Sequence, residues 1–281
     1  MQHHHAHVAS ALAEHRLDGP VLGLAWDGTG DGGDGTAWGG ELLFCDARSS
    51  TRLATLRPLV LAGGAAAIHE PWRIALAALD DAFDGAPPLE QLALFDRIET
   101  RGAQTVRQMI SAGVQSPRAH GVGRLFDAVG ALLFAAPHVR FEGQLAMRLE
   151  GVAIAAEAQP YPFALERGSI PWQIDWRPLL RAVVDDLLRG VAVATIAARF
   201  HDTLIAAAKA AVLAANSECG PLPVVLTGGC FQNALLAGGL ARALAECDVR
   251  LQRSVPPGDG GLALGQVWVA NAVLSTLAGG A

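Results

Sequence analysis

Short apolar runs that stop at glycine alternate along this chain with long amphipathic patterns, and this alternation sets the fold class. Val21 to Trp26 and Val224 to Leu226 contain only apolar residues and glycine, and a glycine follows each run within two residues. Such runs are typical of buried strands that end in functional loops. Between them, apolar residues recur every three or four positions, as in helices that pack on a core. Strands alternating with such helices predict an α/β fold.

Proline and the apolar period predict where the longer elements lie. Pro71 is expected to open a helix, because proline is favoured in the first turn. Helices are predicted at Trp72 to Phe83, Val122 to Ala135, Trp176 to Arg189 and Ile196 to Ala215. Loops are predicted at Pro87 and Pro88, at Pro160 to Pro162 and at Glu218 to Pro223. Polar residues interrupt the uncharged stretch Gly260 to Ala281, which favours a buried core helix over a membrane span.

Composition excludes two classes of partner. With 281 residues, a formal net charge of -6 and a pI of about 5.8, the chain lacks the clustered lysine and arginine that nucleic acid or an anionic membrane requires. The four cysteines, Cys45, Cys219, Cys230 and Cys247, form no C-x-x-C pair. Their spacing fits neither a zinc ribbon nor a disulfide framework, and it favours a reduced, cytoplasmic location. The opening residues carry no secretory signal.

Four histidines lie within the first seven residues. His3 and His7 are four positions apart, so on a helix both imidazoles project from one face, at a spacing that suits two ligands of one metal ion. His4 and His5 project elsewhere and are predicted to be catalytic groups that support the ligands or contact a phosphate. A purification tag is the competing explanation. The alanine inside the cluster and the amphipathic pattern through Leu12 argue against it.

The first strand leads into the glycine-rich segment Asp27 to Gly35, where bare backbone can approach a phosphate and carboxylates can hold a cation. Gly28, Gly30 and Gly33 match the dinucleotide pattern G-x-G-x-x-G. That pattern must open a helix, whereas the next residues, Ala37 to Phe44, are expected to form a strand. A calcium loop is excluded because its twelfth position is a tryptophan instead of a glutamate. A hairpin with tight Asp-Gly turns is the simplest structural alternative.

Two further glycine segments precede helices. Thr227 to Asn233 follows the strand at Val224, so helix-start amides and the helix dipole can face a phosphate that Asn233 contacts. Close packing of strand against helix is the alternative. Pro256 to Gly261 also opens a helix, and Asp259 there is either an N-cap or a metal ligand. One shared site explains the histidines, aspartates and glycines more economically than separate structural roles.

Seven segments resemble the C-terminal domain of the HypF carbamoyltransferases. In order they read HHHAHVASALAEH, LGLAWDGTGDGGDGTAWGGELL, HEPWRIAL, GRLFDAVGALL, FEGQLAMRLE, TGGCFQNALL and PPGDGGLALGQ. The resemblance runs from residue 2 almost to the end, and the domain is similar to the TsaD threonylcarbamoyl transferases. It implies an α/β, two-lobed actin-like ATPase fold with ribonuclease-H-like lobes, the first of them incomplete. Residues 1–115 would then be the remainder of the N-terminal lobe plus a helical insertion, and residues 116–281 the C-terminal lobe.

The resemblance also implies which residues form the site. A divalent metal ion, Fe²⁺, Zn²⁺ or Mg²⁺, is expected to bind His3, His7, Asp27 and Asp259. ATP or carbamoyl-adenylate is expected to contact Gly28, Thr29, Gly30, Asp127, Gly143, Gly228, Gly229 and Asn233. This chain departs from the family at Arg148, where relatives carry a glutamate that contacts ribose. That departure puts nucleotide affinity in question.

The implied activity is transfer of a carbamoyl group from carbamoyl-adenylate to the C-terminal cysteine thiol of HypE, a step toward the cyanide ligands of nickel-iron hydrogenase. The metal and the loop amides would neutralise the leaving phosphate. The expected partners are a HypE-type acceptor and either the remaining HypF domains or a complementing polypeptide. The alternatives are a non-catalytic remnant that binds HypE and an O-carbamoyltransferase of small molecules. Cys230 is not favoured as a nucleophile, because no histidine base stands beside it in sequence.

Overall fold

The computed structural model describes residues 1–153 and 158–278. The described strands form one mixed sheet, whose main path runs β6-β7-β3-β2-β1-β8-β9, while the short strands β4 and β5 pair with each other and β5 also pairs with β2. The strands are β1 (Val21–Asp31), β2 (Ala37–Cys45), β3 (Ser50–Leu56), β4 (Leu59–Val60), β5 (Arg118–Ala119), β6 (Ala164–Glu166), β7 (Trp172–Asp175), β8 (Val224–Thr227) and β9 (Val249–Leu251).

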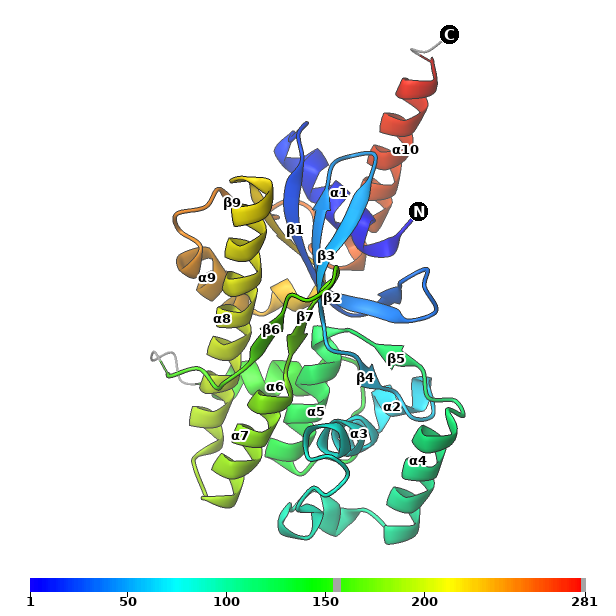
Figure 1. Ribbon diagram of the computed structural model, residues 1–281, viewed down its shortest axis with the longest axis vertical. Coiled ribbons are helices and arrows are strands. Elements are labelled where there is room, and N and C mark those ends of the chain that lie inside the picture. The colour runs from blue at the N-terminus through cyan, green and yellow to red at the C-terminus, as the bar shows by residue number, and fades with distance from the viewer. Residues whose placement is uncertain (154–157, 279–281) are drawn as a thin grey trace.

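Helices cover the sheet and form a separate layer below it in the view of Figure 1. The α-helices are α1 (His3–His15), α2 (Ala65–His69), α3 (Trp72–Ala82), α4 (Thr100–Ala112), α5 (Val122–Phe134), α6 (Gln144–Val152), α7 (Arg177–Leu188), α8 (Val193–Cys219), α9 (Ala234–Ala243) and α10 (Leu262–Ala278). Short 3₁₀ helices are η1 (Leu89–Gln91), η2 (Phe95–Arg97), η3 (Gly229–Gln232) and η4 (Asp259–Gly261).

Strand β1 lies at the centre of the sheet and is buried on both faces. Because side chains alternate across a strand, Leu22 and Leu24 join the large core that includes helices α5 and α8, whereas Val21 and Ala25 join a smaller core under α1. The strand pairs with β2 antiparallel and with β8 parallel. Burial on both faces explains why its first six residues, Val21 to Trp26, carry no polar side chain.

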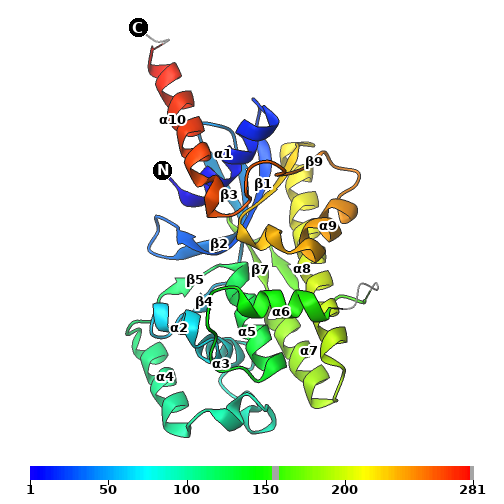
Figure 2. The ribbon, with the colours of Figure 1, turned by 180° about the vertical axis from the view of Figure 1, so that it is seen from behind.

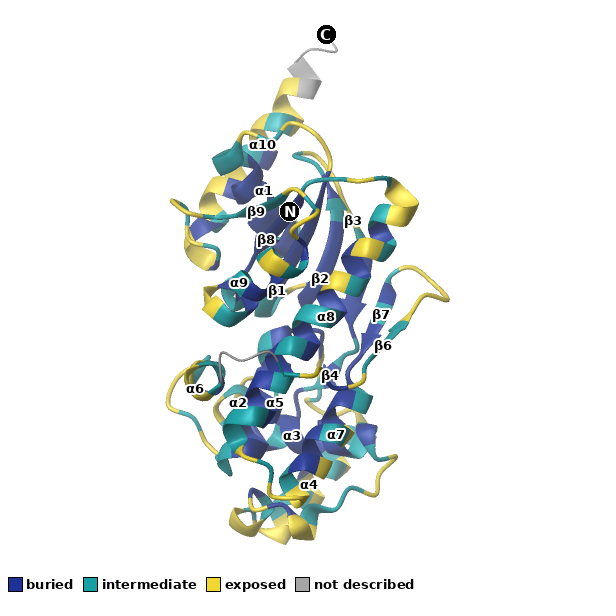
Figure 3. Cartoon of the chain, turned by 90° about the vertical axis from the view of Figure 1, so that its left-hand side faces the viewer, coloured by how far each residue is buried: buried dark blue, intermediate teal, exposed yellow. Residues whose placement is uncertain are grey.

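Figures 1 and 2 show the helices arranged on opposite faces of this strand group, with α1 and α10 on one face and α8 and α9 on the other. Helices α2 to α7 gather at the lower end, where α3, α5 and α7 pack on one another. Figure 3 shows the buried residues continuing from the strands into this helical layer. The helices predicted at α3, α5, α7 and α8 are therefore confirmed, and the chain is α/β as predicted.

The glycine-rich segment after Trp26 is a hairpin, the structural alternative that the sequence analysis retained, and its first strand continues beyond the expected end at Trp26. Strand β1 continues to Asp31, and Gly30 pairs with Trp38 while Asp31 pairs with Ala37. An irregularity in the register between Trp26 and Gly30 interrupts the ladder at Asp27. Such bulges turn a side chain away from its regular direction, and here the turned residue is a candidate metal ligand.

Two further expectations need correction. Helix α8 runs on to Cys219, so the loop predicted from Glu218 starts only after that residue, because Glu218 and Cys219 extend the last turn. The predicted C-terminal helix exists as α10, but it is not a buried core helix. Val267 and Leu274 are 66% and 63% exposed, since α10 touches the body along one face only and projects beyond it (Figure 3).

No helix among the described residues is long and apolar enough to cross a membrane. The loops predicted at Pro87–Pro88 and Pro160–Pro162 are confirmed. Strands β1, β2 and β3 from the first predicted part share their sheet with β8 and β9 from the second. The division at residue 115 stays a prediction.

Candidate metal and nucleotide site

The histidine cluster lies on the first turns of helix α1, which begins at His3 because Gln2 caps it. The Gln2 side-chain oxygen accepts a hydrogen bond from the His5 backbone N–H at 2.7 Å. The helix packs its apolar face on β1 and β2 and contacts α10 along its length. This packing holds His7 fully buried and leaves His3 at the edge of the site.

Four side chains predicted to bind metal converge in the fold. The Nε2 atoms of His3 and His7 are 3.1 Å apart. Oδ2 of Asp27, at the β1 irregularity, lies 3.1 Å from His7 Nε2 and 4.0 Å from His3 Nε2. Oδ1 of Asp259, at the start of η4, lies 3.5 Å from His7 Nε2 and 3.7 Å from His3 Nε2. Helix α1, strand β1 and η4 therefore bring together residues 256 positions apart within one coordination-sized space.

The chemistry of these four atoms fits a divalent cation. Imidazole nitrogens and carboxylate oxygens are ligands of zinc and of the neighbouring transition metals. Bonds of about 2 Å to such an ion would separate tetrahedral ligand atoms by about 3.3 Å, close to the spacings observed here. Oδ2 of Asp27 is also buried without a hydrogen-bond partner among the described residues. A buried carboxylate oxygen is stabilised by a hydrogen-bond donor or by a cation, and a cation between these four side chains would supply that partner.

The protonation state of Asp27 agrees with such a site. Burial alone would raise the pKa of the Asp27 carboxyl, but His3, His7 and the Gly28 backbone N–H together hold that pKa well below its usual range. The carboxylate is thus ionised and available as a ligand at neutral pH.

The other two histidines of the cluster, His4 and His5, lie in different surroundings. His5 Nε2 is 2.7 Å from the carbonyl oxygen of Asp46, so its ring faces away from the four converging side chains. The structure therefore does not bring His5 to the site, in contrast to the prediction. His4 remains beside it: its ring lies 4.9 Å from that of His3 between centroids, and burial, followed by His3 and His7, lowers the pKa of His4 to about 3.

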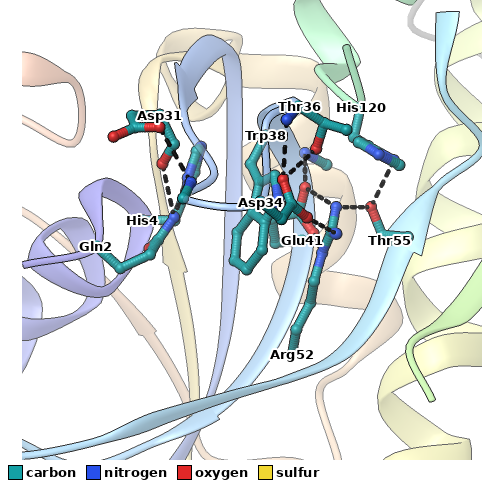
Figure 4. Close-up of polar contacts among 12 residues, drawn as sticks. Gln2, His4, Asp31, Asp34, Thr36, Trp38, Glu41, Arg52, Thr55 and His120 are labelled. Atoms are coloured by element: carbon teal, nitrogen blue, oxygen red, sulfur yellow. Dashed lines mark hydrogen bonds and ion pairs between the residues drawn. The ribbon is translucent and has the colours of Figure 1, made fainter. Parts of the chain in front are cut away.

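His4 has a defined tautomer and one free donor. Gln2 accepts from the His5 N–H with its oxygen, so its Nε2 donates to His4 Nδ1 at 3.1 Å and to the Asp31 carbonyl (Figure 4). The proton of neutral His4 is then on Nε2, which is buried with no partner among the described residues. His4 is placed to donate a hydrogen bond beside the candidate metal site.

A buried polar network anchors the hairpin that carries Asp27. Arg52 donates to both carboxylate oxygens of Glu41, at 2.6 and 3.1 Å, and also to Thr55 (Figure 4). Glu41 in turn accepts from the backbone N–H of Gly39 and Gly40. Paired charges of this kind are costly to separate once buried, so the hairpin is held in one position.

A cavity of about 400 Å³ opens next to the metal cluster, within the range of small-molecule sites. Asp27 belongs to both, because it also lines the cavity. The lining residues are Asp27, Gly28, Gly123, Arg124, Phe126, Glu142, Gly143, Ala146, Met147, Glu150, Gly229, Cys230, Gln232 and Asn233.

The predicted nucleotide contacts divide into two groups. Those that line the cavity are Gly28, Gly143, Gly229 and Asn233, and those that do not are Thr29, Gly30, Asp127 and Gly228. Gly30 lies under the histidines, since a Cβ there would be 2.7 Å from His4 Cε1. Gly228 has φ of +96° and packs on the Trp26 backbone, so it serves the close contact between strands.

The structure places Asp127 and Arg148, the two charged residues that the sequence analysis linked to nucleotide binding, outside the cavity lining. Asp127 is buried under Arg124, and burial, only partly offset by Arg124, raises the pKa of its carboxyl to about 6. Arg148, which departs from the family pattern, is exposed with its guanidinium 3.9 Å from the centre of the Phe134 ring, and it does not line the cavity. Arg148 therefore does not occupy the space that a ligand would need.

Several cavity residues were missed by reasoning from the sequence, notably Arg124, Glu142 and Glu150. All three lie inside the segments GRLFDAVGALL and FEGQLAMRLE that carried the resemblance. None of the three has a spacing to another polar residue that marks a site. His201, which orients Asn233, has no sequence signal at all.

His201 fixes Asn233 at the cavity wall. Its Nδ1–H donates to the Ala197 carbonyl at 2.7 Å, so Nε2 accepts from the Asn233 side-chain amide at 3.0 Å. The Asn233 oxygen is then free to cap helix α9 by accepting from the Leu236 N–H. Protonation of His201 would replace an acceptor with a donor facing Asn233.

This contact predicts a loss of stability in acid. Burial is the largest cause that lowers the pKa of His201 below its usual value of 6.5. As the pH falls below about 6.5 the unfolded chain binds the proton first, so stability is full above that pH and is lost below it, by up to about 1.4 kcal/mol per pH unit. His201→Gln, which can still accept from Asn233, should be less stable at pH 8 but less sensitive to acid. Thermal melts between pH 5 and 8 test this, and parallel pH profiles for the two proteins would contradict it.

Comparison with known proteins identifies the family. A family model for the carbamoyltransferase Kae1-like domain, second subdomain, matches residues 23–266. The chain belongs to the HypF carbamoyltransferase family. Its fold is accordingly the Kae1-like, actin-like and ribonuclease-H-like α/β fold that the resemblance predicted.

Individual relatives agree with this assignment. Carbamoyltransferase HypF2 of Cupriavidus necator is 42% identical over 301 aligned residues, which cover 96% of this chain and 36% of that protein. A HypF homolog from the same organism is 38% identical, with coverage of 96% and 70%. A crystal structure of full-length HypF in the phosphate- and nucleotide-bound form superposes with a TM-score of 0.91 at 36% identity, covering 98% of this chain and 36% of that one. This chain thus spans about a third of the length of HypF2 and of the HypF in the crystal structure, and 70% of the length of the HypF homolog.

Proposed function

We propose that this domain transfers a carbamoyl group from carbamoyl-adenylate to the C-terminal cysteine thiol of a HypE-type acceptor protein, during synthesis of the cyanide ligands of nickel-iron hydrogenase. The observation that carries the proposal is that Asp27 belongs both to a four-residue cluster able to hold a divalent cation and to the wall of the adjoining cavity. A reacting phosphate in the cavity would therefore lie beside a cation. The reaction is proposed for the cytoplasm, where the four unpaired cysteines stay reduced.

In this reaction the acceptor thiolate attacks the carbamoyl carbon. A C–S bond forms, the bond from that carbon to the adenylate phosphate oxygen breaks, and AMP leaves with the electron pair. A cation held by His3, His7, Asp27 and Asp259 would supply positive charge opposite the leaving phosphate.

The chain's own groups have separate roles around the phosphate. A Cβ on Gly229 would lie 3.0 Å from Asp27 Oδ1, so a side chain at this position would fill the space beside Asp27. Because Gly229 has none, its backbone can approach the phosphate there. His4, whose ring centroid lies 4.9 Å from that of His3, has an Nε2–H donor with no partner among the described residues and would supply a hydrogen bond beside the cluster. Cys230 is not the nucleophile: burial, then Asp27, raises the pKa of its thiol well above the usual range.

Transfer can be measured directly. The chain is incubated with carbamoyl-adenylate, Zn²⁺ or Mg²⁺ and a HypE-type acceptor, and the acceptor's C-terminal cysteine is analysed by mass spectrometry. Carbamoylation is expected with the wild type, and a loss of about 100-fold or more is expected with Asp27→Asn, because the variant weakens both the cation site and the ionised wall of the cavity.

The same experiment separates the proposal from its main rival. An acceptor that binds the chain but stays unmodified would show a non-catalytic partner of HypE. A matched control is Asp46→Asn, which alters a carboxylate that accepts only local hydrogen bonds in the β2–β3 turn and should leave transfer unchanged.

A further inference from the structure

Arg124 is an unusually placed cation. It lies in the first turn of α5 with its side chain 2% exposed, and it lines the cavity. Its Nη1 is 3.1 Å from Asp127 Oδ2, but neither Nη1 nor Nε makes a hydrogen bond to any described residue. A buried guanidinium with unsatisfied donors is costly, so this arrangement points to a ligand that completes it.

Among the described residues, the hydrogen-bond partner of the Arg124 side chain is Glu142, which can move away. Arg124 Nη2 donates to Glu142 Oε1 at 2.6 Å, and the Glu142 side chain is 56% exposed. Glu142 lies just before α6 and carries no other hydrogen bond among the described residues. An ion pair with one half-exposed partner contributes little to the free energy of folding, so replacing Glu142 with another anion costs little free energy.

The pair lies where a phosphate would approach the metal cluster. A Cβ on Gly28 would be 2.7 Å from Arg124 Nη2 and 2.8 Å from Glu142 Oε1, so the bare backbone next to Asp27 is in contact with both. The cavity lining carries three carboxylates, from Asp27, Glu142 and Glu150, and Arg124 is the one cation among the described lining residues. Among the described side chains of the lining, Arg124 is therefore the one that attracts an anionic ligand by its charge, whereas Glu142 and Glu150 repel it.

We propose that Arg124 is the anion-binding residue of the cavity and that Glu142 is its exchangeable counter-ion, which the phosphate of an adenine nucleotide displaces on binding. The proposal rests on the nucleotide-dependent function proposed above and adds a specificity device to it. Glu142 competes with every anion, so only a ligand that gains additional contacts in the cavity binds well.

The test compares AMP and adenosine binding by calorimetry at fixed ionic strength and fixed Mg²⁺. Glu142→Gln removes the competing charge from an exposed side chain and should tighten AMP binding about five-fold, the equivalent of a partly exposed ion pair, while leaving adenosine unchanged. Glu150→Gln is the matched control: it removes a carboxylate from the same cavity, but its hydrogen bond goes to the Ala234 N–H, so AMP should gain less.

Arg124→Gln, alone and combined with Glu142→Gln, tests the role of Arg124 itself. Arg124→Gln should weaken AMP binding at least about ten-fold, and adding Glu142→Gln to it should bring no gain, because the charge that both anions compete for is absent. If circular dichroism shows that Arg124→Gln is unfolded, the proposal is tested by Glu142→Gln alone, from its different effects on AMP and adenosine affinity. If Glu142→Gln changes the affinities for AMP and adenosine equally, or leaves the AMP affinity unchanged, the proposed displacement of Glu142 by phosphate is wrong, but the proposed function is not affected. A wild type that binds neither AMP nor adenosine overturns the proposed function as well.

Discussion

Replacing His7 with alanine is expected to abolish specific binding of a divalent metal ion. Its Nε2 lies within 3.5 Å of Asp27 Oδ2, Asp259 Oδ1 and His3 Nε2, so it is the most central of the four candidate ligands. Loss of groups that only support a ligand costs 10- to 100-fold in metal affinity, so loss of the ligand itself should cost more than about 100-fold. Zn²⁺ affinity by calorimetry and metal content after dialysis both report this change.

The control is a histidine two positions away on the same helix. His5→Ala removes an imidazole that is bonded to the Asp46 carbonyl and faces away from the cluster, so Zn²⁺ affinity should stay at the wild-type value. Equal losses for His5→Ala and His7→Ala would show that metal binds to the histidine run as a tag does. Wild-type affinity in His7→Ala would remove the metal site altogether.

Metal binding should also raise the thermal stability of the protein. A cation that binds the folded chain alone adds about 4 kcal/mol when its concentration is 1,000 times the Kd. The wild-type melting temperature should therefore rise with Zn²⁺, whereas that of His7→Ala should not. Because His7 is buried, the two proteins are compared first without metal to separate loss of packing from loss of the site.

The sequence predicted the local part of this site well. A spacing of four on a helix places His3 and His7 on one face whatever the rest of the chain does. The buried parts of the strands were equally clear, because Val21 to Trp26 of β1 and Val224 to Leu226 of β8 have cores on both faces and contain no polar side chain. The approach of Asp27 and Asp259 to the histidines came from the resemblance, since no local rule joins residues so far apart in the chain.

What the sequence missed depends on tertiary contacts. The segment from Asp27 to Asp31 has the glycines of a loop, yet pairing with β2 makes it a strand. The helical spacing placed His5 off the face of His3 and His7, but only the tertiary contact with the Asp46 carbonyl shows that its ring is held away from the site. Arg124 was not predicted because a buried arginine in an apolar helix is recognisable only from the Asp127 and Glu142 side chains around it.

Gly265→Ala is expected to destabilise the fold and the metal site together. Gly265 lies where α10 crosses α1, and a Cβ there would overlap the carbonyl oxygen of Ala6, which is backbone and cannot rotate away. Overpacking usually costs about 1–3 kcal/mol, and a clash between two helix backbones should reach the upper end of that range. Urea unfolding of the metal-free protein measures the loss.

The consequence for metal follows from which elements carry the ligands. Ala6 lies between His3 and His7 on α1, and Asp259 lies in the 3₁₀ turn that leads directly into α10. A shift that separates the two helices must therefore move Asp259 away from both imidazoles, so Gly265→Ala should weaken Zn²⁺ binding even where the protein remains folded. Gly151→Ala is the matched substitution, because it lies in helix α6 with open space around its Cβ and should be neutral or slightly stabilising. If Gly265→Ala kept wild-type Zn²⁺ affinity, the contact between α1 and α10 could not be what sets the distance between the histidines and Asp259.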